Sequence, residues 1–356
     1  MTVLTLPTTR DEAWRWSDMP ALEAARATPS TAAVVPEAIL ADAPRLVFVD
    51  GRLDAGFSTP AGLPLITTAI ASDHPLGRHA AGQGHALTLA AGSITTVEII
   101  RVDAGRSSHT PMLITLGEDA VLTLVETYAG AGWSNALTRF DLARGSRVMR
   151  AVRVVGHDGF VSATDDIRIA DAASFVSTAL GACAAATRFD AALTLAGEGA
   201  FAEYGGVLLT SGDQRQECAV RVRHAAPNGQ SHQLWRAVAA DRSTASLAAA
   251  VEVARHAQKT DGEQSLRGLL LKRTATVNLK PELEIFADDV KCAHGATVGE
   301  LDARALFYMQ SRGIPHARAQ ALLTRAFVAD SLDRIADETV RAAFAADADR
   351  WLEAAL

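Results

Sequence analysis

The sequence is short of aromatic residues and of clustered positive charge, and each shortage argues against a class of protein. Aromatic side chains make up 5% of the 356 residues, whereas 49% of the residues are hydrophobic and many of these are alanine. A core of small side chains suits closely stacked backbone layers better than a bulky globular interior. The net charge is −7 and no basic run occurs, which argues against nonspecific binding of nucleic acid.

Cysteine is also scarce. Cys183, Cys218 and Cys292 are too few and too scattered for the disulfide framework of a small secreted protein, and we expect the first two to be small buried hydrophobic side chains. The first twelve residues show no charged-then-apolar signal pattern. The uncharged stretch 57–72 contains two prolines and is shorter than a membrane span. We therefore expect a cytoplasmic protein that neither crosses a membrane nor binds nucleic acid.

Motifs of several common catalytic sites are missing as well. The sequence has no G-x-x-x-x-G-K-[ST], so it does not bind a nucleotide through a P-loop. It has no H-E-x-x-H or C-x-x-C for zinc, and no G-x-S-x-G for a serine hydrolase. The sequence therefore offers none of these catalytic or nucleotide-binding motifs.

Residues 1–32 are predicted to form an N-terminal helical segment, and residues 33–84 a mixed region of linker and short strands. The helical segment carries Trp14 and Trp16 and is expected to break at Pro20 and Pro29. The tryptophans indicate either a partner surface or, as the simpler interpretation, a helix that docks its aromatic side chains on its own body.

Residues 85–298 are predicted to form a stacked coil of β-strands, because short β-type runs recur between turns of small and acidic residues. The turn positions taken as equivalent are Ala120, Ser146, Ala173 and Ala200, with steps of 26, 27 and 27 residues, and a further pair, Thr274 and Thr297, is 23 residues apart. A fixed period in the twenties without intervening helix is typical of a solenoid, whereas a sandwich or barrel predicts no constant offset. The predicted fold class is mainly β, a right-handed parallel β-helix flanked by N-terminal and C-terminal α-helical segments.

The hydrophobic period changes to that of a helix from Val298 onward, and residues 299–356 are predicted to form a C-terminal helical domain. The first helix is expected to end at Gly313 and Pro315, and two more helices are expected over about 315–330 and 331–352. Such a tail can cap the open end of the solenoid, dock a partner, or do both.

The densest set of candidate metal ligands lies in the stretch Ala287–Asp302. On a strand, residues i and i+2 point to the same face, so Cys292 and His294 are expected side by side. Thiolate and imidazole suit iron or iron–sulfur species, but a closed site takes four ligands, so the others would come from another protein or from sulfide. The alternative is a core Cys292 and a His294 that hydrogen-bonds Asp288 or Asp289.

The other histidines are weaker candidates for a metal site. His74, His79 and His85 lie close together in a Gly-rich loop and can share a metal if the loop folds back, although solvated loop histidines are the simpler interpretation. The histidines expected on the surface of the coil are His224, His232 and His256.

A family resemblance is carried by two adjacent segments. The sequence P-E-L-E-I-F-A-D-D-V-K-C-A-H-G-A-T-V-G-E-L-D over 281–302, followed by A-L-F-Y-M-Q-S-R-G-I over 305–314, closely resembles the C-terminal signature of the SufD branch of the SufB/SufD family. This family belongs to the SUF iron–sulfur cluster assembly system. The match is strong over 255–330 and weaker over the coil, and the N-terminal R-D-E-A-W-R-W resembles the family's opening helix.

The resemblance implies a SufB–SufC–SufD complex in which SufC is the ABC-type ATPase. This chain would be a non-catalytic scaffold subunit that pairs with SufB through the β-helix and docks SufC through its C-terminal helices. The residues expected to bind a partner are Leu301, Leu306, Phe307, Tyr308, Arg312, Gly313, Ile314, Leu322 and Phe327.

The resemblance also implies that iron or a nascent cluster is held transiently between SufB and SufD, with no cofactor bound tightly by this chain alone. His294 is the first candidate ligand and Cys292 the second. SufB carries a cysteine in the segment that corresponds to 277–283, where this chain reads V-N-L-K-P-E-L. That departure assigns the chain to the SufD side.

Three alternatives stay open from the sequence. The chain can be a purely structural partner of SufB without a ligand role. It can also be a carbohydrate-active enzyme on a β-helix that uses acid pairs such as Asp165/Asp166 and Asp288/Asp289, although neighbouring acids on a strand point to opposite faces. The isolated chain can form a homodimer through exposed sheet edges.

Overall fold

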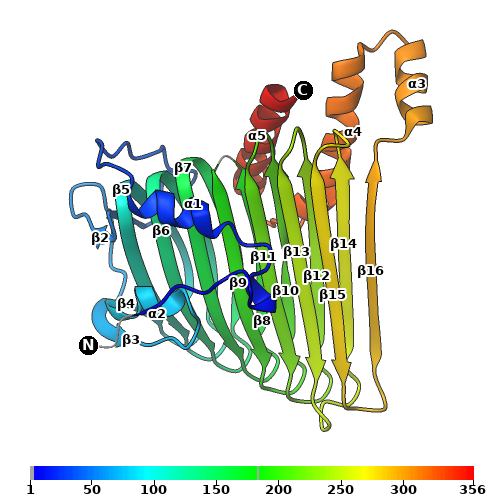
Figure 1. The fold of residues 1–356 in the computed structure, drawn as a ribbon. Coiled ribbons are helices and arrows are strands. Elements are labelled where there is room, and N and C mark those ends of the chain that lie inside the picture. Colours follow the sequence, from blue (N-terminus) through cyan, green and yellow to red (C-terminus); the bar gives the residue numbers. More distant parts are fainter. Residues whose placement is uncertain (1–3, 183) are drawn as a thin grey trace.

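The computed structural model describes residues 4–182 and 184–356, which form a long coil of strands with helices from both chain ends beside it (Figure 1). The N-terminal elements are η1 (Glu12–Trp14), α1 (Met19–Arg26), β1 (Arg45–Val49), β2 (Arg52–Leu53), β3 (Leu65–Ile70), α2 (Gly77–Ala80) and β4 (Gly82–Leu89). The C-terminal elements are α3 (Ala303–Ser311), α4 (His316–Leu332) and α5 (Glu338–Ala355).

The coil between them begins with three long strands and continues with pairs of shorter ones. The long strands are β5 (Ile94–Leu116), β6 (Val121–Leu142) and β7 (Arg147–Ile169). The shorter strands are β8 (Ser174–Ala182), β9 (Ala186–Leu195), β10 (Phe201–Thr210), β11 (Arg215–His224), β12 (Gln230–Ala239), β13 (Thr244–Val253), β14 (Asp261–Leu270), β15 (Thr276–Ile285) and β16 (Lys291–Glu300).

From β8 onward each turn of the coil contributes one strand to each of two stacks. Strands β7 to β16 follow the order β15-β13-β11-β9-β7-β8-β10-β12-β14-β16, so the odd-numbered strands build one face and the even-numbered strands the other. Every neighbouring pair in this order is parallel. The predicted parallel β-helix, with helical segments before and after it in the chain, is therefore confirmed.

The turn positions predicted as equivalent are stacked on one another. A residue with positive φ lies two positions before each of seven strands of the coil, and these residues are Gly92, Asp119, Gly145, Ala172, Gly199, Asn228 and Lys259. Their N–H groups donate from one turn to the next, as from Gly145 to the Asp171 carbonyl at 2.9 Å. The step is 27 residues from Ala172 to Gly199 and then rises to 29 and 31. The proposed equivalence of Thr274 and Thr297 is wrong, because Thr274 precedes β15 whereas Thr297 lies inside β16.

The long strands β5, β6 and β7 pass from one face to the other without a separate turn. Their ladders shift register where the strands bend, between Ala104 and Ser107 and again between Tyr128 and Gly130. Gly130 has φ 105°, and a Cβ there would lie 2.0 Å from the Asp103 carbonyl oxygen. Only glycine allows the two backbones to approach this closely.

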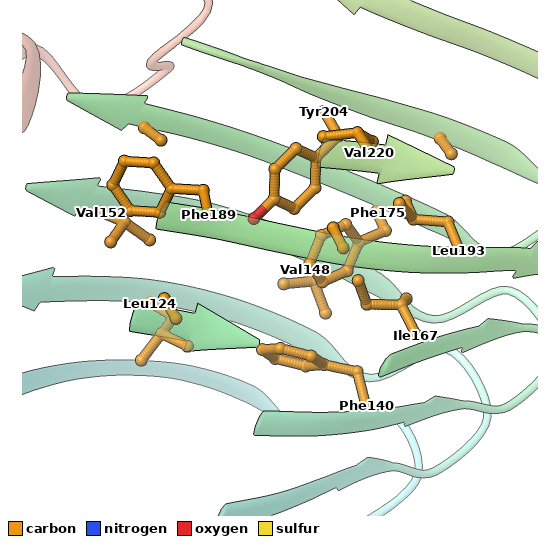
Figure 2. Packing of buried hydrophobic residues seen from close by; sticks show 14 of the residues in the cluster. Leu124, Phe140, Val148, Val152, Ile167, Phe175, Phe189, Leu193, Tyr204 and Val220 are labelled. Carbon is orange, nitrogen blue, oxygen red and sulfur yellow. The ribbon is translucent and has the colours of Figure 1, made fainter. Parts of the chain in front are cut away.

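The interior of the coil is filled by side chains from alternate positions of both faces. Figure 2 shows Phe140, Phe175, Phe189 and Tyr204 among smaller aliphatic side chains of this core. The rings of Phe140 and Phe175 meet edge to face with their centroids 5.0 Å apart. Small residues elsewhere in the core allow the two faces to close, as the alanine-rich composition predicts.

A cluster of charged side chains is also buried inside the coil. Arg150 donates to Glu126 at 2.5 Å and to Asp165 at 2.6 Å, while Arg101 donates to the other oxygen of Glu126. The Tyr204 hydroxyl donates to Asp165 at 2.7 Å. Burial alone would raise the pKa of Glu126, but Arg150 and Arg101 lower it to about 2. The charges are tolerated in the core because each is paired with an opposite charge.

One interpretation of the tail predicts that it caps the open end of the coil. The C-terminal helices do not lie there. The second half of α4 and α5 lie on the outer face of the even-numbered stack, where Phe344 and Trp351 belong to one apolar cluster with Val207 and Val238. An ion pair of 2.9 Å also joins α5 to β7, from Arg153 to Asp347. The last strands of the coil are left bare.

The helical tail begins later than the hydrophobic period suggests, because Val298 still belongs to β16. The Asp302 side chain accepts a hydrogen bond from the Arg304 N–H at 2.8 Å and caps α3, which starts at Ala303. Gly313, with φ 83°, follows the end of α3 as predicted. α4 and α5 are separated by residues 333–337.

The N-terminal segment docks on the odd-numbered face. Trp14 is 5% exposed, and the Arg188 guanidinium lies 3.7 Å from the centre of its indole ring. Docking on the chain's own body, the simpler interpretation, is confirmed for Trp14. The expected break at Pro20 is wrong, because Pro20 lies in the first turn of α1, where its missing N–H has no helical partner.

The buried charge cluster gives a stability prediction. Replacing Arg150 with Met leaves Glu126 and Asp165 without one of their cationic partners in the core, and we expect a loss of about 3–5 kcal/mol in the free energy of unfolding. Urea denaturation measures this loss. Arg144→Met is the control: its pair with Glu118 is largely exposed, and the expected change is below about 1 kcal/mol. Equal losses in the two variants would contradict the assigned role of the cluster.

Candidate functional site

The coil ends in two strands that lack a neighbour on one side. β15 pairs with β13 and β16 pairs with β14, and among the described residues no strand pairs with their other edges. Figure 1 shows β16 as the last strand of the coil, next to the point where the chain turns into α3. Such edges present rows of unpaired backbone groups and are templates for an added strand.

The two edges differ in their hydrogen-bonding capacity. The Lys291 N–H donates to the Thr260 carbonyl, toward β14, so the alternating residues from 292 to 300 direct their N–H groups outward along β16. On β15 the Thr276 N–H donates inward to Ser243, and by the same alternation Pro281 occupies an outward position. Proline has no N–H, so the β15 row is interrupted while the β16 row is continuous.

Cys292 and His294 occupy positions that face the interior in every preceding turn. Cys292 is in register with buried Gly262, and His294 is in register with buried Gln264. Cys292 is half-buried against the core, whereas His294 is exposed because it belongs to the last turn of the coil. The predicted placement on one face of one strand follows from this alternation.

The two side chains provide half of a metal site at most. Among the described residues there is no group of three or more His, Cys, Asp or Glu side chains that could hold a metal ion. Burial raises the pKa of the Cys292 thiol, which disfavours the thiolate form that binds metals. No hydrogen bond joins His294 to Asp288 or Asp289 in the part of the chain that the structure describes.

Apolar side chains are exposed beside these two residues. Ile285 is 41% exposed, Phe286 is 55% exposed and Val298 is 44% exposed, all at the free end of the coil. Val277, Leu279 and Leu283 on β15 are only partly covered, although they continue the inward rows of the core. The open end is therefore an unfinished layer of the interior, where exposed apolar side chains lie beside the cysteine and the histidine.

A second exposed surface lies on α3. Phe307 is 73% exposed and Tyr308 is 60% exposed, and the Arg312 guanidinium lies 5.2 Å from the Tyr308 ring centre. Figure 1 shows α3 and the start of α4 projecting beyond the strand ends. The other partner-binding candidates differ in exposure: Leu301 and Phe327 pack against the chain's own core, Leu306, Ile314 and Leu322 are partly buried, and Gly313 is exposed.

The remaining histidines have other environments. His74 contacts Asp190 at 3.4 Å, His79 packs against Trp133 and His85 packs against Phe48. The described chain contains no metal-binding group of three acidic, Cys or His side chains that includes any of them.

The expected surface position of His224 is wrong. His224 is fully buried, and its Nε2 lies 2.8 Å from the Ser231 hydroxyl. Burial lowers its pKa to about 4, so the ring is neutral near pH 7. Its inward position at the end of β11 follows from the alternation of that strand. His256 is exposed as expected, and His232 is partly buried.

The acid pair Asp165/Asp166 is divided between two faces of the strand, and Cys218 is a core residue. Asp165 is buried and paired with Arg150, whereas Asp166 is exposed beside Arg139, so the two carboxylates point to opposite faces. Cys218 is 2% exposed and packs in the core as expected, and burial raises the pKa of its thiol. The expectation for Cys183 lies outside the described residues.

Within residues 4–182 and 184–356, we find no helix that combines the length and apolar character needed to cross a bilayer.

Comparison with known proteins connects this architecture to one family. The family described as "SUF system FeS cluster assembly, SufBD core domain" matches residues 99–327. The chain is 26% identical to the iron-sulfur cluster assembly protein SufD of Escherichia coli over 94% of this chain and 87% of that protein. It is also 26% identical to a SufBD family protein of Synechocystis over 93% of this chain and 84% of the relative.

A shorter match has higher identity. Protein ABCI7 of Arabidopsis thaliana is 42% identical over 116 residues, which is 32% of this chain and 24% of that protein. The family match covers most of the coil, the open end and α3, so it includes both exposed surfaces. The chain is SufD-like and belongs to the SufB/SufD family of the SUF iron–sulfur cluster assembly system.

Proposed function

We propose that the chain is the SufD subunit of a SufB–SufC–SufD complex and works as a scaffold without catalytic activity of its own. The observation that carries this proposal is the pair of unpaired strands β15 and β16 at the end of an otherwise closed coil. The sequence of this chain lacks a P-loop, which agrees with ATP hydrolysis by SufC. The few scattered cysteines fit a reducing compartment, and we place the complex in the cytoplasm.

Pairing with SufB would complete the unfinished layer. A strand added to β16 can use its continuous row of outward N–H groups, and the partner's inward side chains would cover Leu279, Leu283 and Cys292. Burial of this partly exposed apolar surface would drive the association, and the backbone hydrogen bonds would fix its register. The same edges can bring two copies of the chain together when SufB is absent.

Ala296→Pro tests the pairing. Ala296 directs its N–H away from β14, so proline there removes an outward donor while the existing ladder to β14 is kept. We expect co-purification with SufB to fall at least tenfold, and Ala296→Val, which keeps the N–H, to retain it. Unchanged co-purification of the proline variant, with circular dichroism showing an intact coil, would contradict strand addition at β16.

Docking of SufC is proposed for the exposed side of α3 and the start of α4. Tyrosine and arginine dominate the binding energy of many protein interfaces, and here Tyr308 and Arg312 stack on one another beside exposed Phe307. α3 has no fully buried residue in the described chain, and its exposed Phe307 and Tyr308 are available to a partner. This surface would therefore hold the ATPase next to the open end of the coil.

The double variant Phe307→Ala, Tyr308→Ala tests this docking surface. A loss of about 2 kcal/mol or more is typical of such interface residues, and we expect SufC binding to weaken at least about thirtyfold in isothermal titration calorimetry. Phe57→Ala, which removes an aromatic side chain of 51% exposure in the N-terminal region, is the control and should bind SufC normally. Equal SufC affinities for wild type and the double variant would exclude this site.

Iron or a nascent cluster is the cargo that we assign to the SufB–SufD interface. His294 would supply a neutral imidazole ligand from this chain, with Cys292 as a second ligand once its proton is lost. SufB or sulfide would provide the rest of the coordination. The placement of both residues at the last layer of the coil supports this proposal, because pairing would enclose them.

His294→Ala distinguishes the ligand role from a purely structural partnership with SufB. We expect the complex purified without oxygen to retain at least tenfold less iron while SufB and SufC still co-purify. His256→Ala removes an exposed histidine from the turn before β14 and should leave the iron content unchanged. Normal iron and sulfide content in the His294→Ala complex would exclude His294 as a ligand.

A further inference from the structure

A row of inward-facing residues inside the even-numbered stack leads to His294. One residue from each strand contributes to the row, in register from turn to turn: Arg150, Ser177, Tyr204, Gln233, Gln264 and His294. Arg150 and Tyr204 are satisfied by the buried charge cluster. The two glutamines that follow lie between this cluster and the open end.

Gln264 has an unused acceptor in the core. Its side chain is 1% exposed, its Nε2 donates to the Glu282 carbonyl on β15, and its Oε1 has no partner among the described residues. This contact of 3.4 Å with the Glu282 carbonyl directs the NH₂ group toward the odd-numbered stack, which leaves the oxygen free for another donor. A buried carbonyl oxygen without a donor is unfavourable, so an N–H placed nearby would be bound.

His294 is the next residue of this row and carries such an N–H. Neighbouring strands lie about 4.8 Å apart, so side chains in register on β14 and β16 are within reach of one another. A neutral imidazole donates from one nitrogen and offers a lone pair on the other. Histidines that bind metals usually donate their free N–H to a carbonyl or carboxylate oxygen, which fixes the tautomer.

We propose that Gln264 is the positioning residue for His294. When a partner covers the open end, the Gln264 Oε1 accepts the hydrogen bond from one ring nitrogen of His294. The other nitrogen then presents its lone pair to the interface, ready for iron. This inference rests on the proposed function, since it assumes that His294 is enclosed by SufB.

Gln233 provides a matched control within the same row. It is also 1% exposed, its Nε2 donates across the coil to the Ala250 carbonyl at 3.1 Å, and its Oε1 likewise has no partner among the described residues. However, it is two strands away from His294, roughly 9–10 Å, which is too far for a hydrogen bond. A change caused only by loss of an interior amide would appear in both glutamine variants.

The experiment compares Gln264→Leu with Gln233→Leu in the purified SufB–SufC–SufD complex. Solid-state ¹⁵N NMR of the iron-free complex, with labelled histidine in this chain alone, reports the tautomer of His294, and the His294→Ala spectrum assigns its signals. We expect one tautomer in wild type and Gln233→Leu, and a mixture in Gln264→Leu. Iron titration of the same complexes should show at least tenfold weaker binding for Gln264→Leu only.

Two results would overturn the assignment of Gln264. One is a single His294 tautomer with normal iron affinity in Gln264→Leu, and the other is the same change in both glutamine variants. Failure of the proposed function looks different: His294→Ala would then keep its iron, and the tautomer spectra alone would decide whether Gln264 orients the ring. Co-purification of each variant with SufB verifies that the coil is intact.

Discussion

In-register stacking of parallel strands is the constraint on which the rest of this structure depends. Because each turn lies on the previous one without a shift from β8 onward, an inward position stays inward through all later turns. A charged residue placed on such a position must find its counter-charge in the adjacent layers, as Arg150 does with Glu126 and Asp165. The last strand follows the same alternation. His294 therefore points to the inner side of the coil, but it is exposed because no further turn covers it.

The two surfaces that we assign to partners are adjacent in the sequence. β16 ends at Glu300 and α3 begins at Ala303, so two residues separate the pairing edge from the helix proposed to hold SufC. α4 and α5 in turn are anchored to the even-numbered stack through their apolar face and through Arg153 and Asp347. A displacement of α3 by the ATPase would therefore be transmitted to the edge that carries Cys292 and His294, rather than being absorbed by a flexible linker.

The sequence predicts the local repeat of this fold better than its long-range packing. Small residues at Ala120, Ser146, Ala173 and Ala200 revealed the coil because each turn needs one there, but the longer steps to Asn228 and Lys259 hid the later turns. The burial of His224 and the docking of α5 on the outer face depend on which turn lies beside them, which spacing alone does not specify. No pattern in the sequence indicates a role for Gln264, because its position beside His294 follows only from the register of β14 with β16.

The two ends of the coil are unlike, and this difference bears on stoichiometry. At the beginning of the coil, β1 and β4 are followed outward by β2 and β3, which run antiparallel to them and interrupt the parallel stacking. The far end continues the parallel rows up to the last strand. If the far end is the pairing surface, as proposed, stacking through it would join two subunits, because the other end of each subunit offers no matching row of parallel strands to a third.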